Sequence, residues 1–321
     1  MEDLSKQLQA YGIIPASCVK SRGAHRVEYR AGGRTLSAIL RKETAGEEAL
    51  GLAHEAKERL AQAGFTVDRC VLTAAGKPFA RIDGDIYALT EYISHKEADF
   101  SDAEIFLRVV GETAAMHEAL KGLRRGEPEE SPVRRLERGM DSLRKVKSRL
   151  NIEKRLSDID VMFLKNYGYY RERGEAAIKS LKESGLPRFL RRAAEEGQLR
   201  HNSLKEENIL INGREVCFAN FSNISLGYGL FDLEDLIRRH MKALPQAPAP
   251  FRGVIEEYGR RSRVEDGEVV VLKALLAYPS RFVKICGQYY GKKHAFIPAG
   301  IFSRMEREVS AIEAREKYLE G

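Results

Sequence analysis

The residues best suited to chemistry lie in one stretch, RHNSLKEENILINGREVCFANFSN, which covers residues 200–223. His201 is followed seven residues later by Asn208, then by an apolar segment, an Asn-Gly turn and a second apolar segment. This order is typical of a loop and strand pair that transfer a phosphoryl group, in which one aspartate deprotonates the acceptor and another binds magnesium. The two aspartate positions hold Ser203 and Asn220 in this chain. The stretch therefore predicts a phosphoryl-transfer site without its two acidic groups.

Each replacement has a defined chemical consequence. The hydroxyl of Ser203 has no basicity near neutral pH, and the loss of a general base costs roughly 10²- to 10⁴-fold in rate. Asn220 has nearly the shape of aspartate but no charge, whereas hard divalent cations prefer charged oxygen ligands. We therefore expect no intact catalytic residue and a metal site that is weak or absent.

The other two polar residues of this stretch have structural interpretations. His201 is expected mainly to hydrogen-bond the loop to neighbouring backbone. Asn208 stands at the position of a second metal ligand, but its side chain can also cap the loop into the following strand. Kinases turn over at about 1–100 s⁻¹, so even a roughly 10⁴-fold loss would leave a rate too slow for metabolism.

A phosphotransferase also needs a cation on an N-terminal strand, and LSAILRK, residues 36–42, is the candidate strand. Three registers are open at this position. Leu40 would remove the phosphate contact, Arg41 would keep part of it, and Lys42 is the third alternative. Glu55 or a neighbour would be the partner on the following helix. We predict that these residues form what remains of the nucleotide cleft: Arg41, Lys42, Glu55, Thr90 and Glu91.

The first ninety residues have the pattern of a small antiparallel sheet with one helix. GAHRVEYRAGGRTLSAILRKE predicts two strands around an Ala-Gly-Gly turn. EEALGLAHEAKERLAQAGF has apolar residues at helical spacing, with Gly64 at its C-terminal cap. CVLTAAGKPFARIDGDIYALTEYI predicts three short strands. The expected order is strand, strand, helix, strand, strand, strand.

From Phe100 onward the pattern predicts mainly helices. A Ser-Asp cap opens the helix in SDAEIFLRVVGETAAMHEALKGL. The one strand pair expected in this half is NILING and EVCFANF, joined by the turn at Asn212-Gly213. The end of the chain, residues 269–319, is predicted to be helical except for a bend at FIPAGIF.

Composition and charge narrow the class of protein. No run of about eighteen apolar residues is present, so we expect no membrane span, and the N-terminal sequence predicts no secretory signal. The four cysteines lie far apart without C-x-x-C spacing, which predicts neither a zinc site nor a disulfide framework and fits a reducing cytosol.

The net charge of +7 comes largely from residues 132–155, which hold nine Arg or Lys against three Asp or Glu. We interpret this segment as a solvated helix face, because no aromatic residues are interleaved with the basic ones. Nucleic-acid binding is the weaker alternative, and salt-dependent affinity would be its signature.

An ordered set of motifs carries a family resemblance over nearly the whole length: LAQAGF, YALTEYI, GETAAMHEA, DIDVMFLKNY, HNSLKEENILIN, LFDLEDLIRR and YPSRFVKICGQYYGKKHAF. With them the chain resembles the spore-coat-associated CotS family of endospore-forming bacteria, a branch of the aminoglycoside phosphotransferase and choline kinase-like superfamily. The resemblance implies an α+β, bilobal protein-kinase-like fold. A β-rich lobe would cover residues 1–93, and a helical lobe with one inserted hairpin would cover residues 94–321. The hinge is expected at residues 90–94.

The resemblance and the lost aspartates together imply a degenerate member, a pseudokinase that is a structural or scaffolding component of sporulation or the spore coat. Its expected partners are other spore-coat or sporulation proteins, and its expected location is the mother-cell cytoplasm and then the coat. No cofactor is expected beyond weak binding of ATP and magnesium. Asp232, in FDLEDLI, matches an aspartate that braces this region in the family.

The alternative is a divergent ATP-dependent small-molecule phosphotransferase that recruits another acid. Glu206, Glu207 and Asp235 are the candidates. This alternative requires one of their carboxylates to point into the cleft between the lobes.

Overall fold

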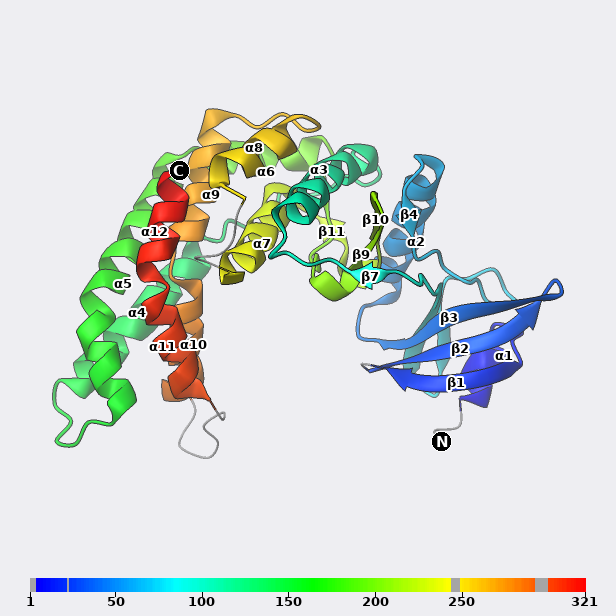
Figure 1. Ribbon diagram of the computed structural model, residues 1–321, viewed down its shortest axis with the longest axis horizontal. Helices are drawn as coiled ribbons and strands as arrows, with labels where there is room; N and C mark the ends of the chain where they lie inside the picture. The colour runs from blue at the N-terminus through cyan, green and yellow to red at the C-terminus, as the bar shows by residue number, and fades with distance from the viewer. Residues whose placement is uncertain (1–3, 22, 244–248, 292–299) are drawn as a thin grey trace.

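The computed structural model describes residues 4–21, 23–243, 249–291 and 300–321. Figure 1 shows an arched molecule with a strand-rich part at one end and a helical part at the other. The N-terminus lies in the first part and the C-terminus in the second. A small group of strands and one helix, α2, lie where the two parts meet.

The strand-rich part is a five-stranded sheet in the order β1-β2-β3-β6-β5, in which every neighbouring pair is antiparallel. Its strands are β1 (Pro15–Ser21), β2 (Ala24–Ala31), β3 (Arg34–Glu43), β5 (Ala80–Ile82) and β6 (Asp85–Glu91). Gly32 and Gly33 both have positive φ in the turn between β2 and β3, which confirms the predicted Ala-Gly-Gly turn. The prediction of a strand at CVLT, residues 70–73, is wrong, because this segment forms one isolated bridge, between Cys70 and Thr90.

Helix α1 (Ser5–Gln9) covers one face of this sheet. Leu8 and Tyr11 lie in a small hydrophobic core with Val27 and Leu40. Successive side chains of a strand point to opposite faces, so burial of Leu40 on this face turns Arg41 toward the other one. That other face is the one that meets α2.

Helix α2 (Glu47–Gln62) connects the two parts of the molecule. It begins after Gly46 and is followed by Gly64 at φ +89°, as the sequence predicted. Its buried side chains, Leu60 among them, belong to the large core that the helical part also forms. The predicted lobe boundary after residue 93 stays a prediction, since elements before it contribute to both cores.

A second sheet lies at the junction, in the order β4-β10-β9-β7. Its strands are β4 (Thr66–Val67), β7 (Lys96–Glu97), β9 (Ile209–Asn212) and β10 (Glu215–Phe218). The hairpin of β9 and β10 confirms the predicted strand pair. The expectation of only one strand pair in this half was wrong: β7, β8 (Leu199–Arg200) and β11 (Ser225–Leu226) are two-residue strands, too short to produce a periodic pattern.

Helices form most of the remaining described residues. They are α3 (Ala103–Leu120), α4 (Val133–Leu150), α5 (Asp158–Glu183), α6 (Leu186–Glu195), α7 (Leu230–His240), α8 (Phe251–Gly259), α9 (Asp266–Ala277), α10 (Ser280–Tyr290), α11 (Ile301–Ser310) and α12 (Ile312–Glu320). Three short 3₁₀ helices are η1 (Glu206–Asn208), η2 (Phe221–Asn223) and η3 (Met241–Ala243). The Asp102 carboxylate caps α3 by accepting from two backbone N–H groups, as predicted. Most of the predicted FIPAGIF bend lies outside the described residues.

The basic segment forms α4 and packs as an amphipathic helix. Leu136, Met140 and Leu143 lie in the large core, and exposed Arg and Lys side chains occupy the remaining face. No helix among the described residues is long and apolar enough to cross a membrane.

Candidate functional site

One buried carboxylate, that of Asp232 on α7, fixes the backbone of the loop that follows β8. The backbone N–H groups of His201 and Asn202 donate to the two oxygens of Asp232, on α7, at 2.6 and 3.0 Å. The His201 ring lies against Phe221, and its Nε2 is 3.1 Å from the carbonyl oxygen of Ala219. The loop therefore has fixed positions both for its backbone and for its histidine.

The charge of Asp232 is stabilised by its surroundings. Burial by itself would raise the pKa of this carboxyl, but the hydrogen bond and charge of His117 and the charge of Arg200 outweigh it and lower the pKa. His117 Nε2 lies 3.1 Å from the Asp232 carboxylate. Burial lowers the pKa of His201, so that ring is neutral at neutral pH.

The two positions at which the sequence analysis expects aspartate, Ser203 and Asn220, are joined by hydrogen bonds between neutral groups. Asn208 Nδ2 donates to the Ser203 carbonyl at 2.8 Å and lies 3.0 Å from the Ser203 hydroxyl. Asn220 Nδ2 donates to Asn208 Oδ1 at 3.3 Å, and the Ser222 hydroxyl donates to Asn220 Oδ1 at 3.0 Å. Ser203, Asn208 and Asn220 are thus in one place, and their polar atoms satisfy one another without a charge.

Asn220 is fixed through its backbone as well. It adopts φ +63°, a left-handed conformation that asparagine tolerates better than most residues. Its N–H donates to Asp68 Oδ2 at 3.1 Å. Asp68 follows β4, so this bond ties the segment after β10 to the segment that leaves α2.

A buried ion pair adjoins this chain. Lys57 Nζ, on α2, lies 2.9 Å from Asp68 Oδ1, and both side chains are about 5 % exposed. Arg41 Nη1 is 4.0 Å from Asp68 Oδ2. Burial raises the pKa of Glu43, although the charge of Arg41 opposes that shift. Two cations and two carboxylates therefore meet where the five-stranded sheet faces α2.

The cavity among these groups is small. Its volume is about 20 Å³, and Arg41, Glu43, Lys57, Asp68 and Asn220 are among the residues that line it. Roughly 10–15 Å³ is needed to hold one water, so the space between the charged groups suits a single water molecule.

The other predicted cleft residues lie in different surroundings. Leu40 is in the core beneath α1, and Lys42 pairs with exposed Asp85 at 2.6 Å. Glu55 pairs with Arg124 at 3.0 Å outside the cavity. Thr90 lines the cavity, and Glu91 ends β6. Arg41 and Thr90 are the two members of the predicted set that reach this cavity.

Sequence reasoning missed Lys57, Asp68 and Glu43. Lys57 lies on the buried face of α2 beside Ala53 and Leu60, so a lysine within an apolar helical stripe was the available signal. Asp68 and Glu43 had no local signal, because the fold alone brings them to α2.

The three carboxylates of the alternative interpretation do not line this cavity. Glu206 pairs with Arg239 at 3.1 Å, and Glu207 lies 3.8 Å from Lys205. Burial and the neighbouring charges of Glu234 and Asp232 raise the pKa of Asp235 to about 6.

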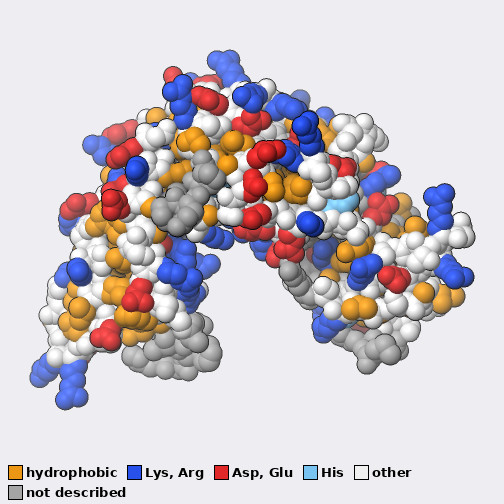
Figure 2. All heavy atoms as spheres, in the orientation of Figure 1, with side chains coloured by type: hydrophobic (Ala, Val, Ile, Leu, Met, Phe, Trp, Pro, Cys, Tyr) orange, Lys and Arg blue, Asp and Glu red, His pale blue; other side chains and the backbone are white. Residues whose placement is uncertain are grey.

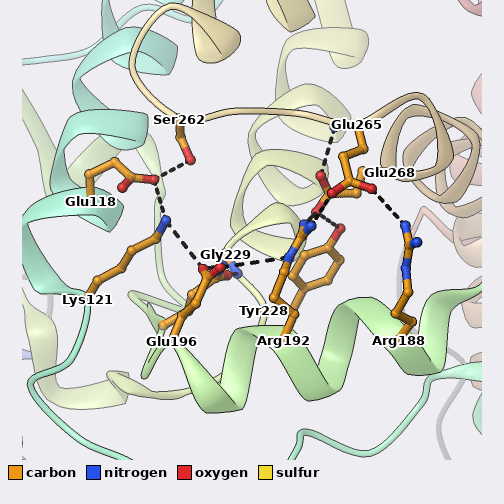
Figure 3. A network of polar contacts seen from close by, with 11 residues as sticks. Glu118, Lys121, Arg188, Arg192, Glu196, Tyr228, Gly229, Ser262, Glu265 and Glu268 are labelled. Atoms are coloured by element: carbon orange, nitrogen blue, oxygen red, sulfur yellow. Dashed lines mark hydrogen bonds and ion pairs between the residues drawn. The ribbon is translucent and has the colours of Figure 1, made fainter.

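A second, larger cavity has a volume of about 300 Å³. It is lined in part by His117, the residue that contacts Asp232. Figure 3 shows polar contacts at and around this cavity: Lys121 bridges Glu118 and Glu196, and a second group of ion pairs lies beside it. The second group contains Arg188, Arg192, Glu265, Glu268 and Tyr228. These contacts link α3, α6 and α9 and hold the helices that support Asp232.

The chain has a fold of the aminoglycoside phosphotransferase type, with a small antiparallel sheet in its N-terminal part and helices in its C-terminal part. An aminoglycoside phosphotransferase from Alicyclobacillus acidocaldarius superposes with a TM-score of 0.88 at 15% identity, covering 98% of this chain and 93% of that chain. The microcompartment-associated aminopropanol kinase has a TM-score of 0.62 at 12% identity, covering 98% and 96%. The amicoumacin kinase hAmiN has a TM-score of 0.62 at 14% identity, covering 99% and 94%. These likenesses confirm the predicted fold.

The sequence also identifies the family. Residues 6–321 match the family described as "Spore coat putative kinase YutH", and the chain belongs to that family. A comparison with curated proteins gives no match. The family agrees with the resemblance to spore-coat-associated, kinase-like proteins.

Proposed function

We propose that this protein keeps the kinase fold but does not transfer phosphate, and that it is a structural or scaffolding component of the spore coat. The observation that carries the proposal is the neutral chain of Ser203, Asn208 and Asn220 at the positions of the base and the metal ligands. A serine cannot act as the base, and two amides offer a divalent cation no charged oxygen.

The nearby charges support the same proposal. Asp68 is a carboxylate in contact with Asn220, but Lys57 neutralises it and the Asn220 N–H occupies one of its oxygens. Binding magnesium there would require the ion pair to break inside a buried site. Truncating one partner of such a pair costs about 3–5 kcal/mol, so this carboxylate is a poor substitute for the missing ligands.

The limited space supports it too. Pockets for small molecules are commonly about 300–1,000 Å³, whereas the cavity among Arg41, Lys57 and Asp68 is about 20 Å³. At this cavity the positive and negative side chains of the protein neutralise one another, whereas phosphates and metal ions take part in this in an active kinase.

A scaffolding role would use the outer surface. Figure 2 shows basic and acidic side chains distributed over the whole arch, with several acidic ones gathered near its middle. Such a surface suits contacts with other spore-coat or sporulation proteins. The corresponding locations are the mother-cell cytoplasm and then the coat.

A nucleotide titration tests the proposal. We expect the melting temperature to respond equally to ATP with magnesium and to ATP with a chelator. The matched variant is Ser203→Asp/Asn220→Asp, which we expect to be less stable than the unmodified protein in chelator and to regain stability when magnesium is added. A large magnesium-dependent rise for the unmodified protein would contradict the proposal. A double variant without any magnesium response would show that these positions are not those of the lost aspartates.

A further inference from the structure

Three side chains with metal-binding atoms meet on the second sheet, away from the loop and its cavity. The ligand atoms of His95, Glu215 and Cys217 all lie within 4.8 Å of one another. His95 precedes β7, and the other two belong to β10. No two of the four cysteines are close in sequence, so the spacing rule for zinc sites could not reveal this group.

The strand register explains why the three side chains converge. Glu215 and Cys217 are two residues apart on β10, so both point to the same face of the sheet. Glu215 is opposite Asn212 on β9, and Lys96 on β7 is opposite Ile211 on the same strand. Extending this register by one residue places His95 opposite Asn212, and therefore in the same cross-strand row as Glu215.

The histidine directs its Nε2 atom toward this group. Its Nδ1 lies 2.8 Å from the carbonyl oxygen of Ser94, which can only accept, so Nδ1 carries the proton. Nε2 of His95 is 3.9 Å from Oε2 of Glu215. A backbone carbonyl that fixes the tautomer in this way is the usual support for a metal-bound histidine.

The Glu215 carboxylate has no lysine or arginine partner among the described residues. Within residues 4–21, 23–243, 249–291 and 300–321, no lysine or arginine lies at ion-pair distance from Glu215. The Thr66 hydroxyl donates to its Oε1, which leaves Oε2 directed at His95. An imidazole nitrogen, a carboxylate oxygen and a sulfur therefore lie close together, and no described lysine or arginine pairs with the carboxylate.

We propose that His95, Glu215 and Cys217 bind one divalent transition-metal ion of the zinc type. Thiolate, imidazole and carboxylate together are a zinc ligand set, whereas magnesium and calcium select oxygen ligands only. Ligand atoms less than 4.8 Å apart can surround a metal at about 2.0–2.3 Å after small side-chain rotations. Water would be the fourth ligand, and the exposed Glu215 side chain marks the entry path.

A metal ion at this site would crosslink two segments at the junction of the two parts. His95 follows the predicted hinge, and β10 pairs with β4, which comes directly after α2. A metal ion bound by His95, just before β7, and by Glu215 and Cys217 on β10 would hold the chain after the hinge against the second sheet. This role is independent of phosphoryl transfer and of the proposed scaffolding role.

Cobalt titration tests the proposal, because a cobalt–thiolate bond absorbs in the near ultraviolet. Protein freed of metal by a chelator, then kept with a reductant, is titrated first with Co²⁺ and then with Zn²⁺. We expect one equivalent of Co²⁺ to produce the thiolate band, Zn²⁺ to remove it, and Zn²⁺ to raise the melting temperature.

Two pairs of variants separate this site from adventitious binding. Cys217→Ser should abolish the band, whereas Cys18→Ser, on β1, should retain it. His95→Gln should weaken Zn²⁺ binding by at least about tenfold, whereas His54→Gln, on α2, should leave it unchanged. His95 is near the surface, so its variant keeps the test valid if Cys217→Ser does not fold. Absence of the band, its persistence in Cys217→Ser, or unchanged affinity in His95→Gln would each overturn the proposal.

Discussion

The buried pair of Lys57 and Asp68 makes the sharpest prediction about stability. Changing Lys57 to Met removes the cation 2.9 Å from Asp68 Oδ1 and keeps a side chain of similar length in the core. The carboxylate then retains only the Asn220 N–H at 3.1 Å and the more distant Arg41 guanidinium at 4.0 Å. A buried charge left without its partner costs about 3–5 kcal/mol, so we expect a loss of that size in the free energy of unfolding.

A double-mutant cycle assigns this loss to the pair. Lys57→Met/Asp68→Asn removes both charges of this pair and keeps an amide oxygen for the Asn220 N–H, so we expect it to be more stable than Lys57→Met alone. The control is Lys42→Met, which breaks an exposed pair with Asp85 and should cost at most about 1 kcal/mol. The assay is urea unfolding followed by circular dichroism. A Lys57→Met variant as stable as Lys42→Met would refute the reasoning.

Three further predictions concern the elements around the loop. Asp232→Asn should cost about 1–3 kcal/mol in urea unfolding, because two backbone N–H groups donate to different oxygens of this carboxylate and an amide has only one. Because the pKa of Asp235 is raised to about 6, its contribution to stability is full below its ordinary pKa near 3.8 and is lost as the pH rises through 6. The melting temperature of Asp235→Asn should therefore rise relative to that of the unmodified protein as the pH increases from 4 to 7.5. A difference that stays constant with pH would contradict this. Gly197→Ala should destabilise more than Gly185→Ala in the same assay, because both have positive φ but only the Gly197 Cβ would meet backbone, at Arg124 and Gly122.

Much of the fold follows from patterns that act locally. The helix cap at Asp102, the turn at Gly32 and Gly33 and the hairpin at Asn212-Gly213 each depend on a few neighbouring residues, and each is present. Helix α1 and the two-residue strands were missed, because five residues or fewer do not establish a period. The seven-residue strand β1 was missed as well, because its side chains are exposed or half-buried and show no apolar alternation.

The site was only partly accessible to the same reasoning. Ser203, Asn208 and Asn220 share one motif, so their proximity could be predicted from spacing. The register of β3 could not be predicted, because LSAILRK is apolar enough to place either Leu40 or its neighbours inward. Packing of α1 on the sheet decides it: Leu40 is buried beneath that helix, and Arg41 faces Asp68.

If the protein is inactive, as we propose, the positions of the charges explain how the frame would keep its shape without the reaction. An active kinase neutralises this region with a strand lysine, a helix glutamate, metal ions and phosphates. In this protein the helix supplies the cation, Lys57, and the chain after β4 supplies the anion, Asp68, which also holds the backbone of Asn220. Burying one of these charges alone would be costly, so each is an internal counter-ion for the other. The pairing removes the need for a ligand to balance the site, and the hydrogen bond to Asn220 keeps the segment after β10 in place. On this argument the loop geometry depends on the ion pair and on Asp232, and nucleotide is not required to maintain it.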